Sequence, residues 1–259
     1  MKIISLGMGV QSTAMYLMSS GGLYDKADYA IFADPQAESK ATYKMLDWLL
    51  NWQKENDGIP IIINRDHNIL EDTLNGVNAL GRKFVTIPAF SENGGMVMRQ
   101  CTGEYKVRPV LKEIRKLYGL KKNQHLPPTE LWLGISIDES SRMKDNVIKA
   151  ITNKYPLIDL MMSRSMCINF FKNNNIPVPS KSSCVFCPYH SDSFWKDIKN
   201  DNSAWQTILD VDNKIRNNTK RGEKDKLYLH RSLKPMSEAY FQENQLDLFE
   251  NECEGHCGL

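Results

Sequence analysis

The chain passes from its first apolar run into its first helical pattern through Ser5-Leu6-Gly7-Met8-Gly9-Val10-Gln11-Ser12-Thr13. In open parallel sheets, ligands gather at the carboxyl ends of strands, and a helix N-terminus offers unpaired N–H groups and partial positive charge to an anion. Gly7 and Gly9 let an anion approach the backbone, while Ser5, Ser12 and Thr13 add hydroxyl donors. The segment matches neither the P-loop motif G-x-x-x-x-G-K-[ST] nor the dinucleotide-binding motif G-x-G-x-x-G. The segment predicts an anion-binding turn or, as the alternative, a tight strand-to-helix turn with a Ser or Thr cap.

Short apolar runs alternate with helical patterns over the first 140 residues. Such alternation predicts βαβ units and a parallel sheet, and the unbroken apolar runs are typical of strands buried on both faces. The predicted fold class is therefore α/β with a doubly wound parallel sheet. We expect strands at Lys2–Leu6, Tyr29–Ala33, Ile59–Asn64 and Leu131–Ile137, and helices over Gln11–Ser20 and from about Ser39 to Lys54.

The second half of the chain is helical and rich in cysteine. Helical patterns cover Pro156–Asn173, Ser193–Lys199 and Ser203–Ile215, and a knuckle with two cysteines lies at Ser183–His190. The last residues, from about Gln242, are acidic. We expect a nucleotide-type α/β domain over residues 1–155, a helical cysteine-bearing extension packed on it over 156–241, and a mobile tail over 242–259.

Composition limits the class of protein. The 259 residues are 41% hydrophobic and 25% charged, which is ordinary globular usage and excludes wholesale disorder. The net charge is +2, so nucleic-acid binding would need a local patch. No apolar run reaches the roughly 18 residues of a membrane helix, and glycines interrupt the N-terminal run before any secretory cleavage site. We expect a soluble cytoplasmic protein with no membrane partner and with its six cysteines reduced.

Five segments in order resemble the phosphoadenosine-phosphosulfate (PAPS) and adenosine-phosphosulfate (APS) reductases of the adenine nucleotide alpha-hydrolase superfamily. The first, Ser5-x-Gly7-x-Gly9-x-Gln11-Ser12, resembles their modified PP-loop. Together the segments span about residues 1–190. The other four are Phe32-Ala-Asp34-Pro-Gln-Ala-Glu38 with Thr42-Tyr43, Cys101-x4-Lys106-x2-Pro109, Gly134-Ile-Ser-Ile-Asp138-Glu139-Ser140-Ser141-Arg142, and Tyr155-Pro156-Leu157-Ile158-Asp159.

The resemblance implies an adenine nucleotide, as PAPS, APS or ATP, bound over Ser5–Thr13 and Gly134. It implies that Asp34 and Glu38 line the adenosine side and that Lys106 and Arg142 neutralise the anion. The sequence departs from the family pattern at three places. Pro35 replaces a Thr, Ser136 stands where the family has the first Arg of its G-x-R loop, and Leu160 stands where it has Trp.

Cys184-Val-Phe-Cys187 is a C-x2-C pair, a spacing that directs two thiolates at one metal. With Cys101, which 82 residues separate from Cys184, the pair resembles the arrangement that holds a [4Fe–4S] cluster in APS reductases, with Gln100 in place of one cysteine. The fourth ligand would be Cys167, His190 or an open coordination site. Zinc and a metal-free redox pair are the alternatives to a cluster, and Cys167 is alternatively a small buried apolar residue.

Two further cysteines, Cys253 and Cys257, lie within the last seven residues. Cys257-Gly258 resembles the mobile C-terminal segment that carries the nucleophilic cysteine of these reductases. His256 beside it favours the thiolate, which is the attacking form. A thioredoxin-like partner, or Cys253, would then resolve the intermediate. A tail whose cysteines are incidental, or only scavenge metal, is the alternative.

Basic residues in the second half leave other functions open. Lys214–Lys226 and His230-Arg231-x-x-Lys234 suit a polynucleotide backbone, although solvated surface charge is the default reading. Together with Ser136, this basic loop favours a second function. That function is a PP-loop ATP pyrophosphatase that inserts sulfur into tRNA or DNA. A non-catalytic nucleotide-binding module is the third.

Overall fold

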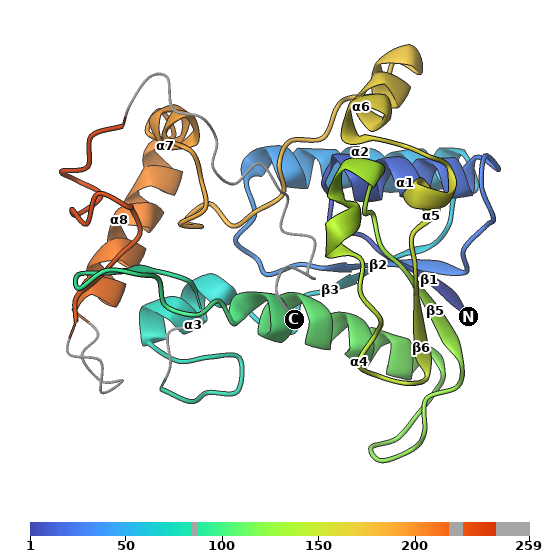
Figure 1. The fold of residues 1–259 in the computed structure, drawn as a ribbon, viewed down its shortest axis with the longest axis horizontal. Coiled ribbons are helices and arrows are strands. Elements are labelled where there is room, and N and C mark those ends of the chain that lie inside the picture. Colours follow the sequence, from blue (N-terminus) through green and yellow to red (C-terminus); the bar gives the residue numbers. More distant parts are fainter. Residues whose placement is uncertain (84–86, 218–224, 242–259) are drawn as a thin grey trace.

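The computed structural model describes residues 1–83, 87–217 and 225–241. At its centre is a five-stranded sheet in which every strand is parallel (Figure 1), so the predicted α/β doubly wound fold class is confirmed. The strand order is β3 (Ile61–Asn64), β2 (Tyr29–Ala33), β1 (Lys2–Ser5), β5 (Thr129–Trp132) and β6 (Ile151–Lys154). The order reverses between β1 and β5, and this is the position where open sheets bind ligands.

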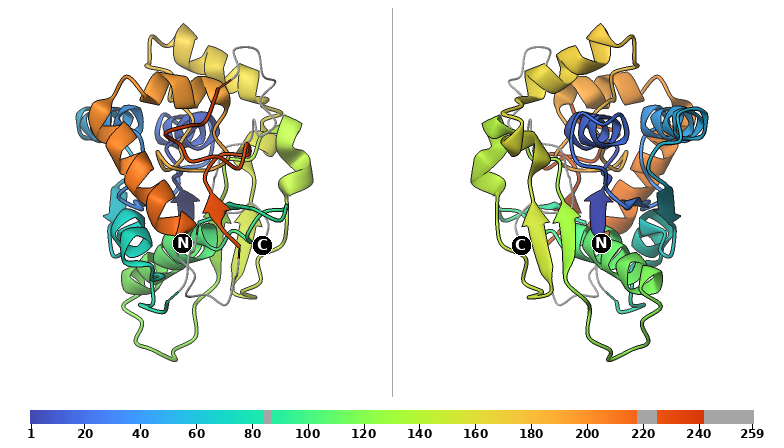
Figure 2. Two further views of the ribbon diagram at one scale, coloured as in Figure 1. Left: turned by 90° about the vertical axis from the view of Figure 1, so that its left-hand side faces the viewer. Right: turned by 90° about the vertical axis from the view of Figure 1, so that its right-hand side faces the viewer.

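Helices cover both faces of the sheet (Figures 1 and 2). Successive strand residues point to opposite faces: Ile4 and Phe32 join one hydrophobic cluster, while Ile3 and Ile31 join another. On the first face lie α1 (Val10–Ser20), α2 (Lys40–Glu55), α5 (Pro156–Asp159) and α6 (Arg164–Asn173), and on the second lies α4 (Arg108–Leu117).

A third hydrophobic cluster lies beside the sheet, around the helices at the left of Figure 1. Its buried members include Phe186, Trp195 and Ile208, and it also takes Ile69 and Tyr105 from the first half of the chain. The boundary expected at residue 155 therefore does not separate the hydrophobic clusters. The elements here are α3 (Ile69–Asn75), α7 (Asp192–Ile198), α8 (Asn202–Arg216) and the antiparallel pair β4 (Phe90–Ser91) and β7 (Leu227–Tyr228).

Two predicted elements need correction. The helix expected over Pro156–Asn173 is broken into α5 and α6, with Met161 between them at a φ of +51°. The strand expected at Leu131–Ile137 ends at Trp132, and a 3₁₀ helix, η2 (Ile137–Arg142), follows. Within the described ranges, we find no helix long and apolar enough to cross a membrane.

Candidate functional site

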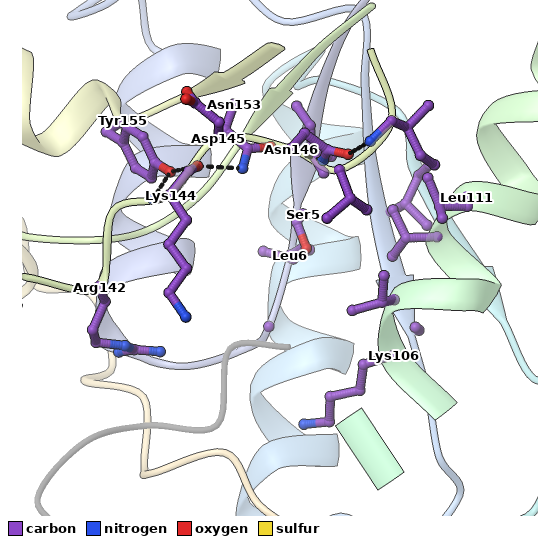
Figure 3. A pocket seen from close by; sticks show the side chains of 18 of the residues that line it. Ser5, Leu6, Lys106, Leu111, Arg142, Lys144, Asp145, Asn146, Asn153 and Tyr155 are labelled. Atoms are coloured by element: carbon purple, nitrogen blue, oxygen red, sulfur yellow. Dashed lines mark hydrogen bonds between the residues drawn. The ribbon is translucent and has the colours of Figure 1, made fainter. Parts of the chain in front are cut away.

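A pocket lies at the carboxyl end of β1, where the strand order reverses; we call it the cation pocket (Figure 3). Ser5, Leu6 and Gly7 bring the first turn to its wall. Strands β2 and β5 and helix α4 supply an apolar surface, and residues 144–148 close another side. The apolar residues are Ile31, Phe32, Ala33, Val110, Leu111 and Leu131.

Three cations line this pocket, and their charged ends lie on the same side of it in Figure 3. Lys106 comes from a π-helical turn, η1 (Gly103–Val107), Arg142 from the end of η2, and Lys144 from the loop that follows. The Lys106 Nζ lies 3.2 Å from Glu38 Oε1, and the Arg142 Nη1 lies 2.8 Å from Glu139 Oε1. Lys106 and Arg142 were expected from the sequence, whereas Lys144 was missed.

Only the first residues of the turn after β1 line the cation pocket. Ser5 and Gly7 line the pocket, and Gly9 is the N-cap of α1 without a side-chain cap bond, so the Ser or Thr cap of the alternative reading is wrong. Gln11, Ser12 and Thr13 are fully buried and are not among the lining residues that the structure describes. Their expected role as direct ligand donors is therefore not supported by their placement.

Gln11 instead joins a polar network at the start of α1. Its amide donates to Glu139 Oε2 at 3.2 Å, and its carbonyl oxygen accepts from Arg164 Nη1 at 2.7 Å. Because Glu139 also pairs with Arg142, Gln11 connects α6 to a cation of the pocket. Arg164 was missed by the sequence analysis. The only signal for it is a basic residue just after Ser163, the N-cap of α6.

Gly134 holds the turn after β5 against α1. A Cβ at this position would lie 2.7 Å from the Ser12 backbone nitrogen and 2.8 Å from Ser12 Cα, so only glycine fits without a backbone shift. The residue does not line the cation pocket in the described structure. Its contribution is to bring the turns of β1 and β5 together, rather than to contact a ligand.

Asp34 and Glu38, which we expected on the adenosine side of the ligand, are both buried and bound to other side chains. Asp34 accepts from Tyr43 Oη at 2.9 Å and from Arg65 Nε at 2.8 Å. Burial, and next the charge of Asp34, raise the pKa of Tyr43, so its hydroxyl remains a donor. Glu38 accepts from Lys106 and, at 3.1 Å, from Ser182 Oγ. Neither residue is among the pocket's described lining residues.

A second pocket contains three thiols, and we call it the thiol pocket. Cys101, Cys184 and Cys187 all line it, although 82 residues separate the first two. The Cys187 amide donates to the Cys184 carbonyl at 2.9 Å, which makes the knuckle a tight turn. A β-bridge between Glu38 and Cys184 ties that turn to the segment after β2. Burial, followed by the nearby charge of Glu38, raises the pKa of the Cys184 thiol.

Of the two fourth ligands considered from the sequence, Cys167 lies in another cluster, whereas His190 bonds to the backbone of the knuckle. Cys167 is fully buried in the cluster that includes Phe171 and α1, whereas Cys101 and Cys184 pack against the third cluster. The His190 Nε2 lies 2.8 Å from the Cys184 carbonyl oxygen, and the ring stacks on Phe194 with centroids 3.4 Å apart. Burial lowers the pKa of His190 to about 3, so the ring is neutral and Nε2 donates its proton to that carbonyl. Cys167 is therefore corrected from ligand to core residue.

Across residues 1–83, 87–217 and 225–241, no three His, Cys, Asp or Glu side chains form an arrangement that would hold a metal ion. The chemistry of the donors nevertheless fits a thiolate-bound group, because three soft ligands line one pocket. Lys106 lines this pocket as well as the cation pocket. Lys106 is therefore shared by the pocket that the first turn lines and the pocket that the three thiols line.

In the basic patch His230–Lys234, His230 and Arg231 are bound to Asp192, while Lys234 is exposed. His230 is buried, with Nε2 3.2 Å from Asp192 Oδ1, and Arg231 Nη2 lies 2.5 Å from the same oxygen. Cys253, Cys257 and most of Lys214–Lys226 lie outside the described residues.

Comparison with models of protein families, with curated proteins and with solved structures found no match.

Proposed function

We propose that this protein is an enzyme of sulfur metabolism that binds an adenine nucleotide in the cation pocket and acts on it beside the thiol pocket. The observation that carries the proposal is the position of Lys106, whose side chain lines both pockets. A substrate bound in the first pocket would lie next to thiol chemistry in the second. The motif resemblance to PAPS and APS reductases supports the same reading.

The chemistry of the cation pocket suits a nucleotide. Its apolar wall offers a slot for a base, and its cations match phosphate or phosphosulfate oxygens. Asp145, which also lines the pocket, is an acceptor for ribose hydroxyls or for an exocyclic amine. One slot therefore combines three kinds of contact that a nucleotide needs.

Cys101, Cys184 and Cys187 would hold a [4Fe–4S] cluster in this proposal, with zinc as the alternative. Such a group supplies positive charge and, in the case of iron, redox chemistry. Lys106 would add a fixed cation between that group and the substrate. Glu38 limits the mobility of this lysine, because the ion pair holds Nζ at the common wall.

In the reductase version, the Cys257 thiolate attacks the sulfur of the phosphosulfate. A sulfur–sulfur bond forms, the sulfur–oxygen bond to phosphate breaks, and the nucleotide leaves with that oxygen. A dithiol of a thioredoxin-like partner then attacks the Cys257 sulfur and supplies two electrons, so that sulfite is released and a disulfide forms. Lys106 and Arg142 would stabilise the charge that develops on the departing phosphate.

The second candidate is an ATP pyrophosphatase that adenylates an oxygen of a nucleic acid and replaces it with sulfur. The positions of Cys167 and His190 favour it, because the described residues then supply three thiols to the pocket, and a coordination position for an external sulfide would stay open. A nucleotide-binding module without catalysis is the third candidate.

Products separate the candidates. The protein would be purified without oxygen, and its iron, sulfide and zinc quantified. The reconstituted protein would then be incubated with APS or PAPS together with a dithiol reductant, and separately with ATP together with tRNA or DNA. Sulfite plus a nucleotide from a phosphosulfate supports the reductase, and pyrophosphate from ATP supports sulfur insertion. Nucleotide binding without either product supports the third candidate. Failure to bind any nucleotide contradicts the proposal.

A further inference from the structure

Residues 144–148 form a loop that is one wall of the cation pocket. Side chains of β6 and of Tyr155, the residue after β6, hold this loop in place. Every residue of this loop lines the pocket. Asn153 Oδ1 accepts from Asn146 Nδ2 at 3.0 Å, and Asn146 Oδ1 accepts from the Ile148 amide at 2.9 Å. An exposed loop with this many specific bonds is built to hold one shape.

The bonds converge on the backbone of Lys144. The Tyr155 hydroxyl accepts from the Lys144 amide at 2.9 Å and donates to the Lys144 carbonyl at 2.6 Å. Asn153 Nδ2 donates to the same carbonyl at 2.8 Å. Two side chains therefore fix the direction in which Lys144 leaves the chain, and Figure 3 shows its side chain extending toward Arg142. Fixing an exposed lysine has a purpose if its ammonium group must meet a ligand.

The charges around the pocket explain what this lysine adds. Lys106 and Arg142 each lie against a carboxylate, of Glu38 and Glu139, and these ion pairs hold their charged ends in place. Lys144 is the third cation of the wall, and Asp145 is the one carboxylate among its described lining residues. The three side chains come from three segments and place N–H donors at three positions on one side of the pocket, which suits two phosphoryl groups better than one.

We infer that Lys144, held by Tyr155, is a specificity-determining residue that makes the cation pocket prefer nucleotides with two or more phosphoryl groups to the nucleoside monophosphate. This inference rests on the proposed function, since it places a nucleotide in that pocket. The second phosphoryl group has two sources: a 5′-polyphosphate, as in ADP and ATP, or a separate phosphate, as in adenosine 3′,5′-bisphosphate.

Calorimetry at one fixed salt concentration tests the inference with AMP, ADP, ATP and adenosine 3′,5′-bisphosphate. For the wild-type protein we expect the bisphosphate or the polyphosphates to bind more tightly than AMP, and the tighter class identifies the source of the second phosphate. In Lys144→Met, affinity for that class should fall roughly 10- to 100-fold, the range of one charge-assisted bond, while affinity for AMP changes by less than about threefold.

Two further variants complete the test. Tyr155→Phe keeps Lys144 but removes the hydroxyl that holds it, and we expect it to lower the same affinity ratio. Lys149→Met, at an exposed lysine outside the pocket's lining, should leave the ratio unchanged. Three results would overturn this inference and leave the proposed function standing. They are equal losses of affinity for AMP and for the larger nucleotides in Lys144→Met, no loss of affinity in that variant, and equal affinities of the wild-type protein for AMP and the larger nucleotides. Wild-type protein that binds none of the four would overturn the proposed function with it.

Discussion

The Lys106 ammonium group lies 3.2 Å from the Glu38 carboxylate, and the pair stands where the cation pocket and the thiol pocket meet. Glu38 is completely buried as a side chain, while Lys106 retains 14% exposure. The ion pair joins the segment after β2 to η1, and the β-bridge to Cys184 joins the same segment to the knuckle. One carboxylate therefore links the segments that line the cation pocket and the thiol pocket.

Removing Lys106 should be strongly destabilising. In Lys106→Met the buried Glu38 loses its cation, and breaking a buried pair from one side costs about 3–5 kcal/mol. Chemical denaturation at pH 7 would measure the loss. The double variant Lys106→Met, Glu38→Gln should recover part of it, because the neutral amide still accepts from Ser182. Lys112→Met removes an exposed ion pair with Asp66 and should cost less than about 1 kcal/mol. A double variant no more stable than the single one would contradict the role given to Glu38.

Replacing Gly134 with alanine should disturb the first turn. The new Cβ would lie 2.7 Å from a backbone atom of Ser12, so the start of α1 must shift, at a cost of about 1–3 kcal/mol. Nucleotide affinity should fall as well, because the same shift moves Gly7 at the pocket wall. Gly103→Ala is the matched control, since a Cβ there meets no atom within 4 Å. Equal stability of the two variants, measured by denaturation, would show that the close approach carries no cost.

The sequence was sufficient for the central architecture because the fold signal lies in local patterns. The run Tyr29–Ala33 is a strand with the predicted bounds, and the buried strands read as unbroken apolar segments. Edge strand β6 was missed because its sequence, Ile-Thr-Asn-Lys, is mostly polar. The three cysteines that spacing and resemblance grouped at one metal line one pocket.

Spacing alone failed where a contact depends on how the elements pack. Cys167 is as plausible a ligand as Cys184 by composition, yet its helix faces α1 rather than the knuckle. The same holds for Gln11, which the motif placed at the ligand and which the fold places between Glu139 and Arg164. The sequence around Lys144 predicts only a solvated lysine. Its fixed position becomes visible in the structure, through the two bonds between its backbone and the Tyr155 hydroxyl.

Metal content should separate the cysteines into two groups. After anaerobic purification, Cys101→Ser, Cys184→Ser and Cys187→Ser should each lose most of the bound metal, because each removes one of three thiolates from one pocket. Cys167→Ala is the control and should keep wild-type metal content, since it removes a core side chain. Elemental analysis per chain is the measurement. Full metal content in the three serine variants would contradict a metal site shared by these three thiolates.

Acid should weaken the fold partly through His230. Burial lowers the pKa of this ring, while the nearby carboxylate of Asp192 opposes the shift. The amide of Ser232 donates to Nδ1, so the neutral ring carries its proton on Nε2 and donates it to Asp192. A histidine whose pKa is depressed on folding binds more protons when unfolded, so its contribution is present above the unfolded pKa of about 6.5 and is lost as pH falls below it. The difference in free energy of unfolding between wild type and His230→Asn should therefore shrink between pH 7.5 and pH 5, because the variant has no ring to protonate. Urea denaturation across that range measures the difference. A difference that stays constant, or grows toward low pH, would mean that the folded protein accepts the proton at least as readily as the unfolded chain.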